Sequence, residues 1–320
     1  MQGYARWSLR AVTPVSKHSA VYHFTSDDGE RGTPIRKGRG GRTVWSKTWH
    51  TTLLAEVGEA ANNEGPLPWV ERDYTPVSTA HEWEQGRCDI LIKVYLDPPG
   101  LATRWLHSVS APPPAAGAGA AAGTAAAAGG GAGAVVWLSR PMKTLHVPSL
   151  SLDQQYINRK HASVLLLVAG TGVVAVPQVL HHARAGSCFG PRPPITSTPV
   201  HVMYSCRSDD ALLVPELAGW CKDGSLARCT VLVTPAHAAA AAPFPDVADV
   251  DVASAFATVD SAVCVNARLS PELVRAELSQ MQKPHRVVVS GPEGFNAAVK
   301  AMLSQIDDEL GAAAVTVLSA

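Results

Sequence analysis

Short, continuous apolar runs recur through the second half of the sequence and restrict the folds open to it. The first run is Ser163–Val168 (SVLLLV), and four more follow it: Val200–Tyr204, Thr230–Val233, Arg286–Val289 and Val315–Leu318. A strand buried on both faces of a parallel sheet has this composition. Helical periodicity marks the segments between the runs: Val174–Ala183, Ala211–Cys221, Pro271–Met281 and Phe295–Leu310. This alternation predicts an open α/β parallel sheet with right-handed crossovers over residues 156–320.

The first half has a different pattern, in which short strands alternate between apolar and polar residues and are separated by turns. The predicted strands are Trp7–Val12, Ser19–Phe24, Thr48–Val57, the run from Arg72, Arg87–Leu96 and Val135–Leu138. Several short strands without a long helix predict an antiparallel Greek-key β-barrel over residues 1–155. An Ala/Gly-rich insertion at 111–134 interrupts it, and a second loose excursion is expected at 236–252. The fold class is therefore α+β with two domains.

Composition excludes several classes of protein. Among 320 residues, 27 are basic and 27 acidic, so charge gives no reason to expect a nucleic acid or an anionic membrane as partner. Six cysteines occur without any Cys-x-x-Cys spacing, so no metal site or disulfide framework is expected and a reducing compartment fits. No apolar run predicts a transmembrane segment. We expect a cytoplasmic protein, although an N-terminus free of acidic residues until Asp27 leaves an organelle open.

One stretch of the first half combines three chemically useful side chains. It reads Arg-Asp-Tyr-Thr-Pro-Val-Ser over Arg72–Ser78. On an extended strand, Arg72 and Tyr74 project to one side and Thr75 to the other. A guanidinium grips a diphosphate, a phenol lies along a ring, and a hydroxyl donates to a ring nitrogen. The stretch suits a flavin dinucleotide, and the alternative is an ordinary edge strand with a solvated arginine.

Further candidates follow other predicted strands. Gly100–Leu106 has the pattern of a turn that opens a helix, whose free N–H groups suit a phosphate. Ala169–Ala175 reads Gly-x-Gly-x-x-Ala between a strand and a helix, as in dinucleotide-binding loops. A further turn over Ser290–Phe295 brings bare backbone to the same sheet edge, where ligands bind in such sheets.

The polar residues after the second apolar run, Val200–Tyr204, leave the nucleotide undecided. Asp209 or Asp210 would hold the hydroxyls of an adenine ribose, whereas Ser205 and Arg207 would hold a 2′-phosphate. Either aspartate also has the position of an N-cap for a helix from Ala211 onward. The sequence therefore leaves NADH and NADPH open.

The order of these motifs resembles the ferredoxin–NADP reductase superfamily, in particular its cytochrome b5 reductase and nitrate reductase flavin branch. The motifs are RDYTPVS, LIKVY, GLATRWL, VAGTG, YSCRSDDALLVPEL and SGPEGF, and apart from the insertions the resemblance covers roughly residues 6–310. It implies an FAD-binding barrel followed by an NAD(P)-binding domain.

The resemblance also implies roles for single residues. Arg72 would bind the FAD diphosphate, Tyr74 would pack on the flavin, and the Thr75 hydroxyl would face flavin N5, with Thr75 and Ser290 the catalytic candidates. The remaining cofactor-binding candidates are Ser78, Lys93, Val94, Tyr95, Gly100, Thr103, Gly170, Thr171, Gly172, Ser205, Arg207, Asp209, Gly291 and Pro292.

The chain departs from the family pattern at several places. Ser290 stands where the family has a cysteine beside the nicotinamide, which should slow hydride transfer without abolishing it. Val174-Ala175 replaces a Thr-Pro, and Arg140-Pro-Met-Lys143 lacks both glycines of the family's turn. The chain also has no aromatic C-terminus to cover the flavin. FAD binding is therefore better supported than efficient NAD(P)H turnover.

The leading hypothesis is an FAD-dependent oxidoreductase that passes a hydride from NAD(P)H to flavin N5. Because the chain shows no haem or cluster ligands, electrons would leave to a separate acceptor such as a small haem protein, a quinone or a metal chelate. The alternative is a flavin-binding module with a decayed nucleotide site and a non-catalytic or assembly role. In a third view, the Arg-rich loop at 31–42 docks an acidic redox partner; as a plain charge run it would face solvent.

Overall fold

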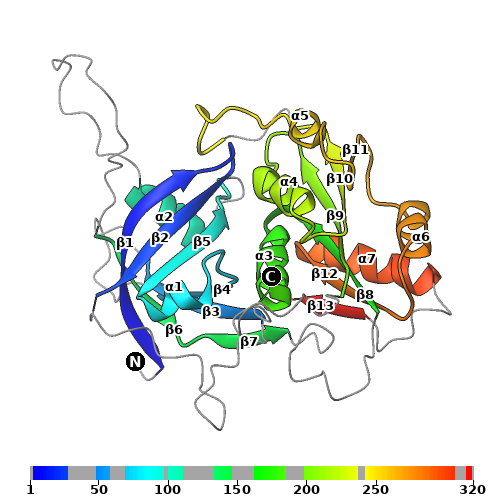
Figure 1. Cartoon of the computed structure of the whole chain (residues 1–320). Coiled ribbons are helices and arrows are strands. Elements are labelled where there is room, and N and C mark those ends of the chain that lie inside the picture. The colour runs from blue at the N-terminus through cyan, green and yellow to red at the C-terminus, as the bar shows by residue number, and fades with distance from the viewer. Residues whose placement is uncertain are drawn as a thin grey trace, which may run out of the picture. The chain divides into compact units, whose positions relative to one another are not determined.

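The structure, a computed structural model, describes residues 3–27, 48–57, 69–96, 100–110, 133–145, 162–184, 198–236, 242–306 and 315–318. The chain divides into two compact units (Figure 1). The first comprises Met1–Thr43, His50–Met142 and Ala239–Val247, and the second Val44–Trp49, Lys143–Ala238 and Ala248–Ala320.

The first unit is built on an antiparallel sheet. Its strands are β1 (Tyr4–Pro14), β2 (Ser19–Ser26), β3 (Thr48–Glu56), β4 (Trp69–Tyr74), β5 (Arg87–Lys93) and β6 (Val135–Ser139). They are ordered β4-β3-β6-β1-β2-β5, and β7 (Met142–Leu145) pairs with β3 off this path. The chain beyond β4 bonds to β5 through a Pro76–Ile90 bridge and a 2.9 Å bond from Val77 N to Asp89 O. This contact joins the two ends of the path, and the predicted antiparallel barrel is confirmed.

Alternation along β5 shows why these residues form a half-buried strand. Cys88, Ile90 and Ile92 are at most 1% exposed on one face, whereas on the opposite face Lys93 is half-buried and Leu91 is 3% exposed. Side chains on a strand alternate between faces, so one side of the pleat builds the barrel core. The arrangement matches the predicted faces of this strand.

A short helix, α1 (Ala80–Glu84), follows β4 and begins with a capping box that the sequence reasoning missed. The Thr79 hydroxyl accepts from Glu82 N at 3.2 Å, and a Glu82 carboxylate oxygen accepts from Thr79 N at 2.7 Å. Both bonds satisfy N–H groups that a helix start leaves free. The box fixes where the chain turns after the Arg72–Ser78 stretch.

Replacing Thr79 with alanine is expected to lower the free energy of unfolding by about 1 kcal/mol, because the cap hydroxyl is lost. Thr79→Ser keeps the hydroxyl and is the matched control. Chemical denaturation followed by circular dichroism measures the difference. Equal midpoints for the alanine and serine variants would show that the cap does not contribute.

The second unit is an open sheet of six parallel strands. They are β8 (Ser163–Ala169), β9 (Val200–Arg207), β10 (Arg228–Thr234), β11 (Ala262–Val265), β12 (His285–Ser290) and β13 (Val315–Leu318), in the order β11-β10-β9-β8-β12-β13. The helical segments are η3 (Gly170–Val174), α3 (Ala175–Arg184), α4 (Val214–Lys222), α5 (Val252–Phe256), α6 (Pro271–Ser279) and α7 (Glu293–Ile306). All seven residues of β8 are buried, as its apolar run predicts for a central strand.

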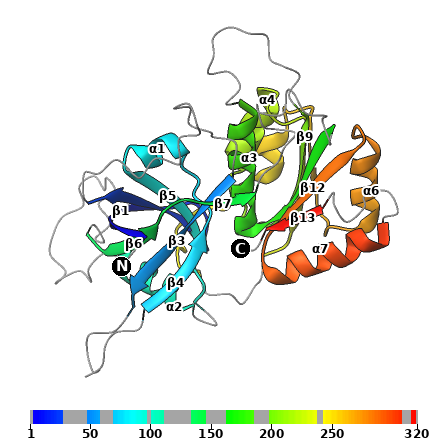
Figure 2. The same cartoon turned by 90° about the horizontal axis from the view of Figure 1, so that it is seen from below.

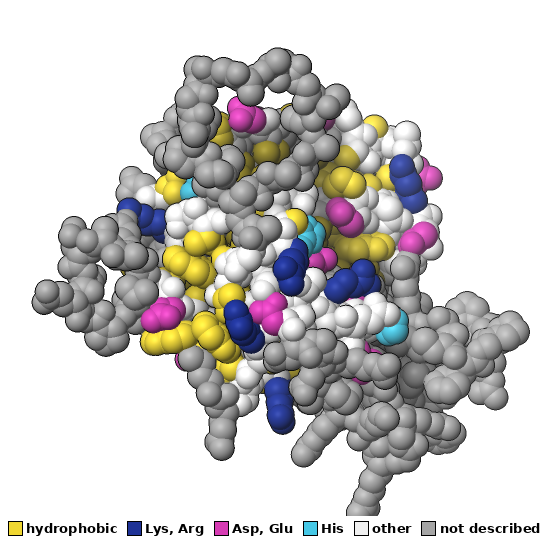
Figure 3. All heavy atoms as spheres, turned by 90° about the vertical axis from the view of Figure 1, so that its left-hand side faces the viewer, with side chains coloured by type: hydrophobic (Ala, Val, Ile, Leu, Met, Phe, Trp, Pro, Cys, Tyr) yellow, Lys and Arg dark blue, Asp and Glu magenta, His cyan; other side chains and the backbone are white. Residues whose placement is uncertain are grey.

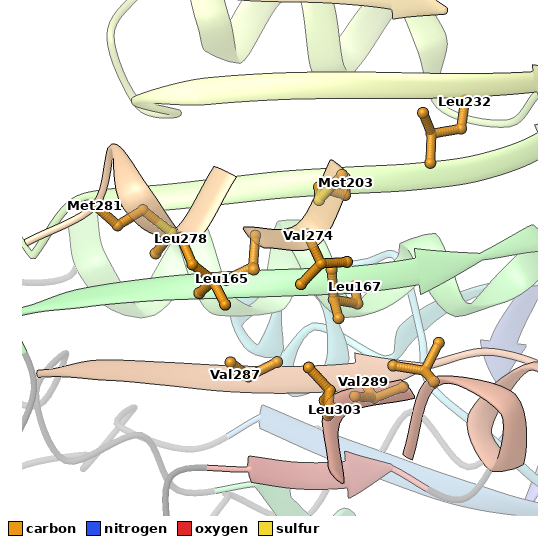
Figure 4. Close-up of a cluster of buried hydrophobic side chains, with 11 residues drawn as sticks. Leu165, Leu167, Met203, Leu232, Val274, Leu278, Met281, Val287, Val289 and Leu303 are labelled. Atoms are coloured by element: carbon orange, nitrogen blue, oxygen red, sulfur yellow. The ribbon is translucent and has the colours of Figure 1, made fainter. Parts of the chain in front are cut away.

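Buried aliphatic side chains hold α6 and α7 against one face of this sheet. Leu167 and Val289 from the strands meet Val274 of α6 and Leu303 of α7 in one cluster (Figure 4). Figure 2 shows both helices beside β12. The predicted parallel α/β sheet is confirmed, and its carboxyl edge carries the ends of β8, β9 and β12.

Several expectations need correction. An N-cap at Asp209 or Asp210 is wrong: α4 begins at Val214, and Leu213 occupies the cap in a left-handed conformation, φ 54°, without a side-chain cap bond.

The sequence reasoning also missed α1, α5, β7 and β11, all of which are short. Residues 242–247, part of the loose excursion expected at 236–252, group with the first unit. There Phe244 N donates to Lys17 O at 3.1 Å, and the Phe244 ring meets His107 edge-on. That part of the expected loose excursion is therefore packed.

Two stretches with a predicted loop structure cannot be compared with the fold. The Arg-rich loop at 31–42 and almost all of the 111–134 insertion lie outside the described residues. Among the helices that the structure describes, none is long and apolar enough to cross a membrane.

Candidate functional site

The first group of candidate residues gathers at the ends of β4 and β5 in the first unit. Burial raises the pKa of the Tyr74 phenol to about 12; the charge of Arg72 opposes this shift and the Tyr95 phenol adds to it. Tyr74 therefore lies near both Arg72 and Tyr95. Lys93 Nζ lies 5.8 Å from the centre of the Tyr95 ring, within reach of a cation–π interaction. The group therefore combines two cations with two phenols.

Arg72 is exposed, and its side chain bonds to a backbone oxygen. Arg72 Nη1 donates to Glu71 O at 2.7 Å, and β4 lies at one end of the strand path. The exposed guanidinium and the terminal position of β4 fit the edge-strand alternative, and they equally fit an arginine that binds a phosphate. The guanidinium remains accessible to an incoming anion, which an ion-paired arginine would not be.

A helix start lies beside this group. Arg104 N donates to Gly100 O at 2.8 Å, so Gly100 is the cap of α2 (Leu101–Ser110), and Thr103 Oγ1 donates to the same oxygen at 3.3 Å. A Cβ on Gly100 would lie 2.8 Å from Thr103 Oγ1, which favours glycine there. Because α2 packs against β4, the free N–H groups of its first turn belong to an element next to Arg72.

Three other candidates of this unit lie differently. The Ser78 hydroxyl is buried and accepts from Asp89 N at 3.0 Å. Val94 is 2% exposed, and its amide donates to His18 O at 2.8 Å. Thr75 is half-buried, directly after the last residue of β4. The side chains of Ser78 and Val94 are buried, and their cofactor roles stay predictions.

In the second unit, two glycine-containing turns close against each other at the carboxyl edge of the sheet. A Cβ on Gly172 would lie 2.1 Å from Ser290 O and 2.7 Å from Gly291 N. A Cβ on Gly291 would lie 3.1 Å from that of Ala169. Gly170 has φ +51°, a conformation that favours glycine, with open space around it. The structure therefore brings the predicted loop and the Ser290–Pro292 turn into backbone contact.

The side chains of this edge differ in exposure. Ser290 is 7% exposed and Val174 is equally buried, Thr171 is half-buried, and Pro292 is exposed. Backbone and small side chains thus make up the carboxyl ends of β8 and β12. This is the kind of bare surface that lets a diphosphate approach a sheet edge.

The end of β9 carries an orphaned hydroxyl and an ion pair. Ser205 pairs in register with Ala169, and its buried Oγ has no hydrogen-bond partner among the described residues. Arg207 Nε lies 3.0 Å from Asp209 Oδ1, and Arg207 Nη2 donates to Asp209 Oδ2 at 3.2 Å. Asp209 is 7% exposed, so the pair is partly desolvated. The two residues that the sequence assigned to opposite nucleotides therefore bind each other.

Sequence reasoning missed the residue that shapes this turn. The Tyr204 phenol is buried and accepts from Leu212 N at 2.9 Å. Burial raises the pKa of this phenol well above its ordinary value, so it stays neutral. The bond holds Leu212 and the left-handed Leu213 beside β9, which delays the start of α4. A tyrosine inside an apolar run was the available signal, because a buried phenol needs a partner.

Comparison with known proteins gives matches at the level of structure. No protein-family model and no curated protein sequence matches the chain. The cytochrome b5 reductase domain of Ulva prolifera nitrate reductase is similar with a TM-score of 0.59 and 17% identity, covering 98% of this chain and 97% of that domain.

Two other solved structures are similar over the whole chain. The flavohaem-like FAD/NAD-binding domain of nitric oxide dioxygenase from Vibrio cholerae has a TM-score of 0.55 and 16% identity, covering 99% of this chain and 98% of that one. A ferredoxin–NADP+ reductase from Neisseria gonorrhoeae, solved with bound FAD and NADP, has a TM-score of 0.53 and 11% identity, covering 99% and 98%. The chain thus has the fold of the ferredoxin–NADP reductase superfamily.

Proposed function

We propose that the chain is an FAD-dependent oxidoreductase that passes a hydride from NAD(P)H to flavin N5 and on to a separate acceptor. The observation that carries the proposal is the position of Tyr74 near Arg72 and Tyr95, with Tyr95 O accepting from Gly100 N at 3.3 Å at the start of α2. A cation, two phenols and free helix N–H groups match the diphosphate and rings of a flavin dinucleotide. The solved structures with this fold include one with bound FAD and NADP, which supports the same cofactors here.

The residues present fit FAD in the first unit. The accessible Arg72 guanidinium and the first-turn amides of α2 would hold the diphosphate, and Tyr74 and Tyr95 would pack along the rings. Bound flavin supplies the hydride-accepting centre, while the protein supplies position and electrostatics. The Thr75 hydroxyl, directly after β4, would donate a hydrogen bond to the flavin ring.

The second unit fits a nicotinamide nucleotide. Gly170 has open space beside it at the carboxyl edge, and the orphaned Ser205 hydroxyl beside Ala169 lacks an acceptor or donor that a ligand would provide. Ser290 would bring a hydroxyl, and not a thiol, toward the nicotinamide. Val174 brings an apolar side chain to the same edge.

We further propose that the nucleotide is NADH. In the described structure the Arg207 guanidinium is already paired with Asp209 through both of its carboxylate oxygens. A 2′-phosphate would meet a neutralised arginine beside a carboxylate, and charge repulsion disfavours that contact. Asp209 could accept hydrogen bonds from ribose hydroxyls without losing its partner.

Replacing Asp209 with asparagine is expected to raise the ratio of kcat/KM for NADPH to that for NADH about tenfold, because it frees Arg207 for a phosphate at roughly 1.4 kcal/mol. Asp260→Asn removes an exposed carboxylate of the same unit and is the control. Steady-state reduction of a dye with each nucleotide gives the ratio. An unchanged ratio in Asp209→Asn would show that the pair does not select the nucleotide.

The acceptor is a separate molecule in this proposal. Figure 3 shows one face with hydrophobic side chains gathered beside interspersed basic and acidic ones, so its described part carries charges of both signs. Among described residues, no group of three or more His, Cys, Asp and Glu is arranged for a metal ion. A small haem protein, a quinone or a metal chelate would take the electrons.

The test is an anaerobic absorbance spectrum of purified protein, before and after one equivalent of NADH and then of NADPH. The expected result is a flavin band at about 450 nm that NADH bleaches. A band that neither nucleotide bleaches would favour the flavin-binding module with a decayed nucleotide site, which the buried Val174 and Ser290 motivate. No band after incubation with FAD would refute both functions.

A further inference from the structure

Three neighbouring strands of the first unit carry a threonine, a histidine and an aspartate that bond in series. β1, β2 and β5 lie side by side in the antiparallel sheet (Figure 1). Thr13 Oγ1 of β1 lies 2.9 Å from His23 Nε2 of β2, and His23 Nδ1 lies 2.9 Å from Asp89 Oδ1 of β5. Both contacts have the length of a good hydrogen bond. A hydroxyl, an imidazole and a carboxylate thus follow one another, and we call these three residues the triad.

The strand register explains how these side chains meet. His23 is in register with Asp89, so the two side chains are direct cross-strand neighbours. On the other side of β2, Ala11 is the partner of His23, after a register shift between Leu9 and Ala11. Because Ala11 carries only a methyl group, it leaves room for the imidazole ring to extend to Thr13, which follows Ala11 on the same face of β1.

The triad lies on the outer face of these strands. Tyr22 and Phe24, which flank His23 along β2, are at most 1% exposed, so the alternation of the strand turns His23 away from the core. Thr13 is exposed, and the side chains of His23 and Asp89 are 35% and 33% exposed. A small molecule can therefore reach the Thr13 hydroxyl, while the two groups behind it are partly shielded from water.

The bonding pattern gives each ring nitrogen of His23 a separate role. An ionised aspartate can only accept hydrogen bonds, so His23 Nδ1 donates to Asp89. In the neutral imidazole the other nitrogen then carries a lone pair, and the Thr13 hydroxyl donates to His23 Nε2. A base that accepts the proton of a hydroxyl, and that a carboxylate holds in this tautomer, is the arrangement that activates a hydroxyl as a nucleophile.

Two other described histidines have only part of this arrangement. His201 Nδ1 lies 2.7 Å from Glu277 Oε1, but His201 is buried, and no hydroxyl among the described residues bonds to its ring. Ser163 Oγ lies 3.4 Å from His285 Nδ1, but it donates to Gln282 O at 2.7 Å, which directs its proton away from the ring. In the triad, by contrast, the hydroxyl proton points at the base and the hydroxyl oxygen is open to solvent.

We propose that Thr13 is an acyl-acceptor site, at which its hydroxyl takes the acyl group of an activated ester with His23 as general base. The Thr13 oxygen attacks the carbonyl carbon, and the bond from that carbon to the leaving oxygen breaks. The Thr13 proton passes to His23 and then to the departing alkoxide or phenoxide. The products are an ester of Thr13 and an alcohol or phenol, with no change of oxidation state. Asp89 acts through His23 and is a positioning residue.

None of the three residues is among the proposed cofactor-binding residues, so this site is independent of the proposed flavin function. The alternative is a polar ladder, in which cross-strand hydrogen bonds stabilise the sheet and the hydroxyl has ordinary reactivity. Thr25 of β2 provides the internal comparison. It lies two residues from His23 on the same face, and its hydroxyl accepts from Arg10 Nε at 2.6 Å. A polar ladder predicts equal reactivity of Thr13 and Thr25.

The test incubates the full-length protein with para-nitrophenyl acetate and maps acetylated residues by mass spectrometry of its peptides. Thr13 is expected to be acetylated about 100-fold faster than Thr25, since a positioned general base typically contributes at least that factor. Acetylation of lysine amines in the same sample measures the general reactivity of the reagent. Equal acetylation of Thr13 and Thr25, or acetylated lysines beside an unmodified Thr13, would overturn the proposal.

Variants of the triad assign the roles. His23→Gln keeps a polar side chain but removes the base, and it should slow acetylation of Thr13 about 100-fold. Asp89→Asn should slow it to a smaller extent, because the base remains but its tautomer is no longer held. Thr13→Ser keeps the hydroxyl and should be acetylated at least as fast as the wild type.

Thr25→Ala is the matched control and should leave acetylation of Thr13 unchanged. Circular dichroism shows whether each variant is folded, and the comparison of Thr13 with Thr25 in the wild type decides the proposal if one is not. A wild-type rate of Thr13 acetylation in folded His23→Gln would overturn the assignment of His23 as the base.

Discussion

Replacing Arg72 with alanine is expected to weaken FAD binding by roughly 10- to 150-fold, because hydrogen bonds to a charged group contribute about 1.5–3 kcal/mol. Arg72 is exposed on β4 and its side chain bonds to a backbone oxygen, so its loss costs the fold little. Arg72→Lys keeps the charge without the two-pronged donor, so its affinity for FAD should lie between those of the wild type and Arg72→Ala. Titration of apoprotein with FAD, followed by quenching of flavin fluorescence, measures the affinity.

The matched control is Arg87→Ala in the same unit. Arg87 lies on β5, is exposed, and makes a surface contact of 3.9 Å to Glu82 and a 2.8 Å bond to Gln85. Surface pairs of this kind contribute little to stability. If both alanine variants bound FAD like the wild type, Arg72 would be the solvated arginine of an edge strand and the flavin site would lie elsewhere.

Strong periodic signals predicted most of the fold, and weak ones were lost. The apolar run of β8 and the alternation of β5 each reflect burial of one or two faces, which sequence records directly. The four elements missed are short: α1 and α5 have five residues each, and β7 and β11 have four. Segments of that length complete no clear period, so their structure is fixed by neighbours and not by their own pattern.

The candidate site was predicted in part, and physical reasons explain the rest. The resemblance implied that Arg72, Tyr74 and Tyr95 serve one cofactor; in the structure Tyr74 interacts electrostatically with the other two, and their cofactor roles stay predictions. The Arg207–Asp209 pair was not predicted, because each residue was considered as a ligand of a different nucleotide. The left-handed conformation of Leu213 in the turn that follows has no local signature, and the Tyr204 hydroxyl that bonds to Leu212 has only a weak one, a tyrosine inside an apolar run. The backbone contact between Gly172 and Ser290 could not be predicted from the sequence either, because it too has no local pattern.

Gly172→Ala is expected to destabilise the second unit by about 3 kcal/mol, near the upper end of typical overpacking costs, and to abolish reduction by NADH. The added Cβ would lie 2.1 Å from Ser290 O and 2.4 Å from Ser290 C, and both are backbone atoms that cannot rotate away. The ends of β8 and β12 would have to separate, which widens the edge proposed to hold the nucleotide. Denaturant unfolding and anaerobic flavin reduction measure the two effects.

Gly219→Ala separates this effect from the general cost of losing a glycine. Gly219 lies inside α4, and a Cβ there would meet nothing within 4 Å, so alanine should stabilise the helix by about 0.5–1 kcal/mol. Opposite signs for two Gly→Ala changes in one unit would assign the loss at Gly172 to its contact with Ser290. A Gly172→Ala protein with wild-type stability and wild-type NADH reduction would show that the two turns separate freely, and the proposed nucleotide site would then lose its structural basis.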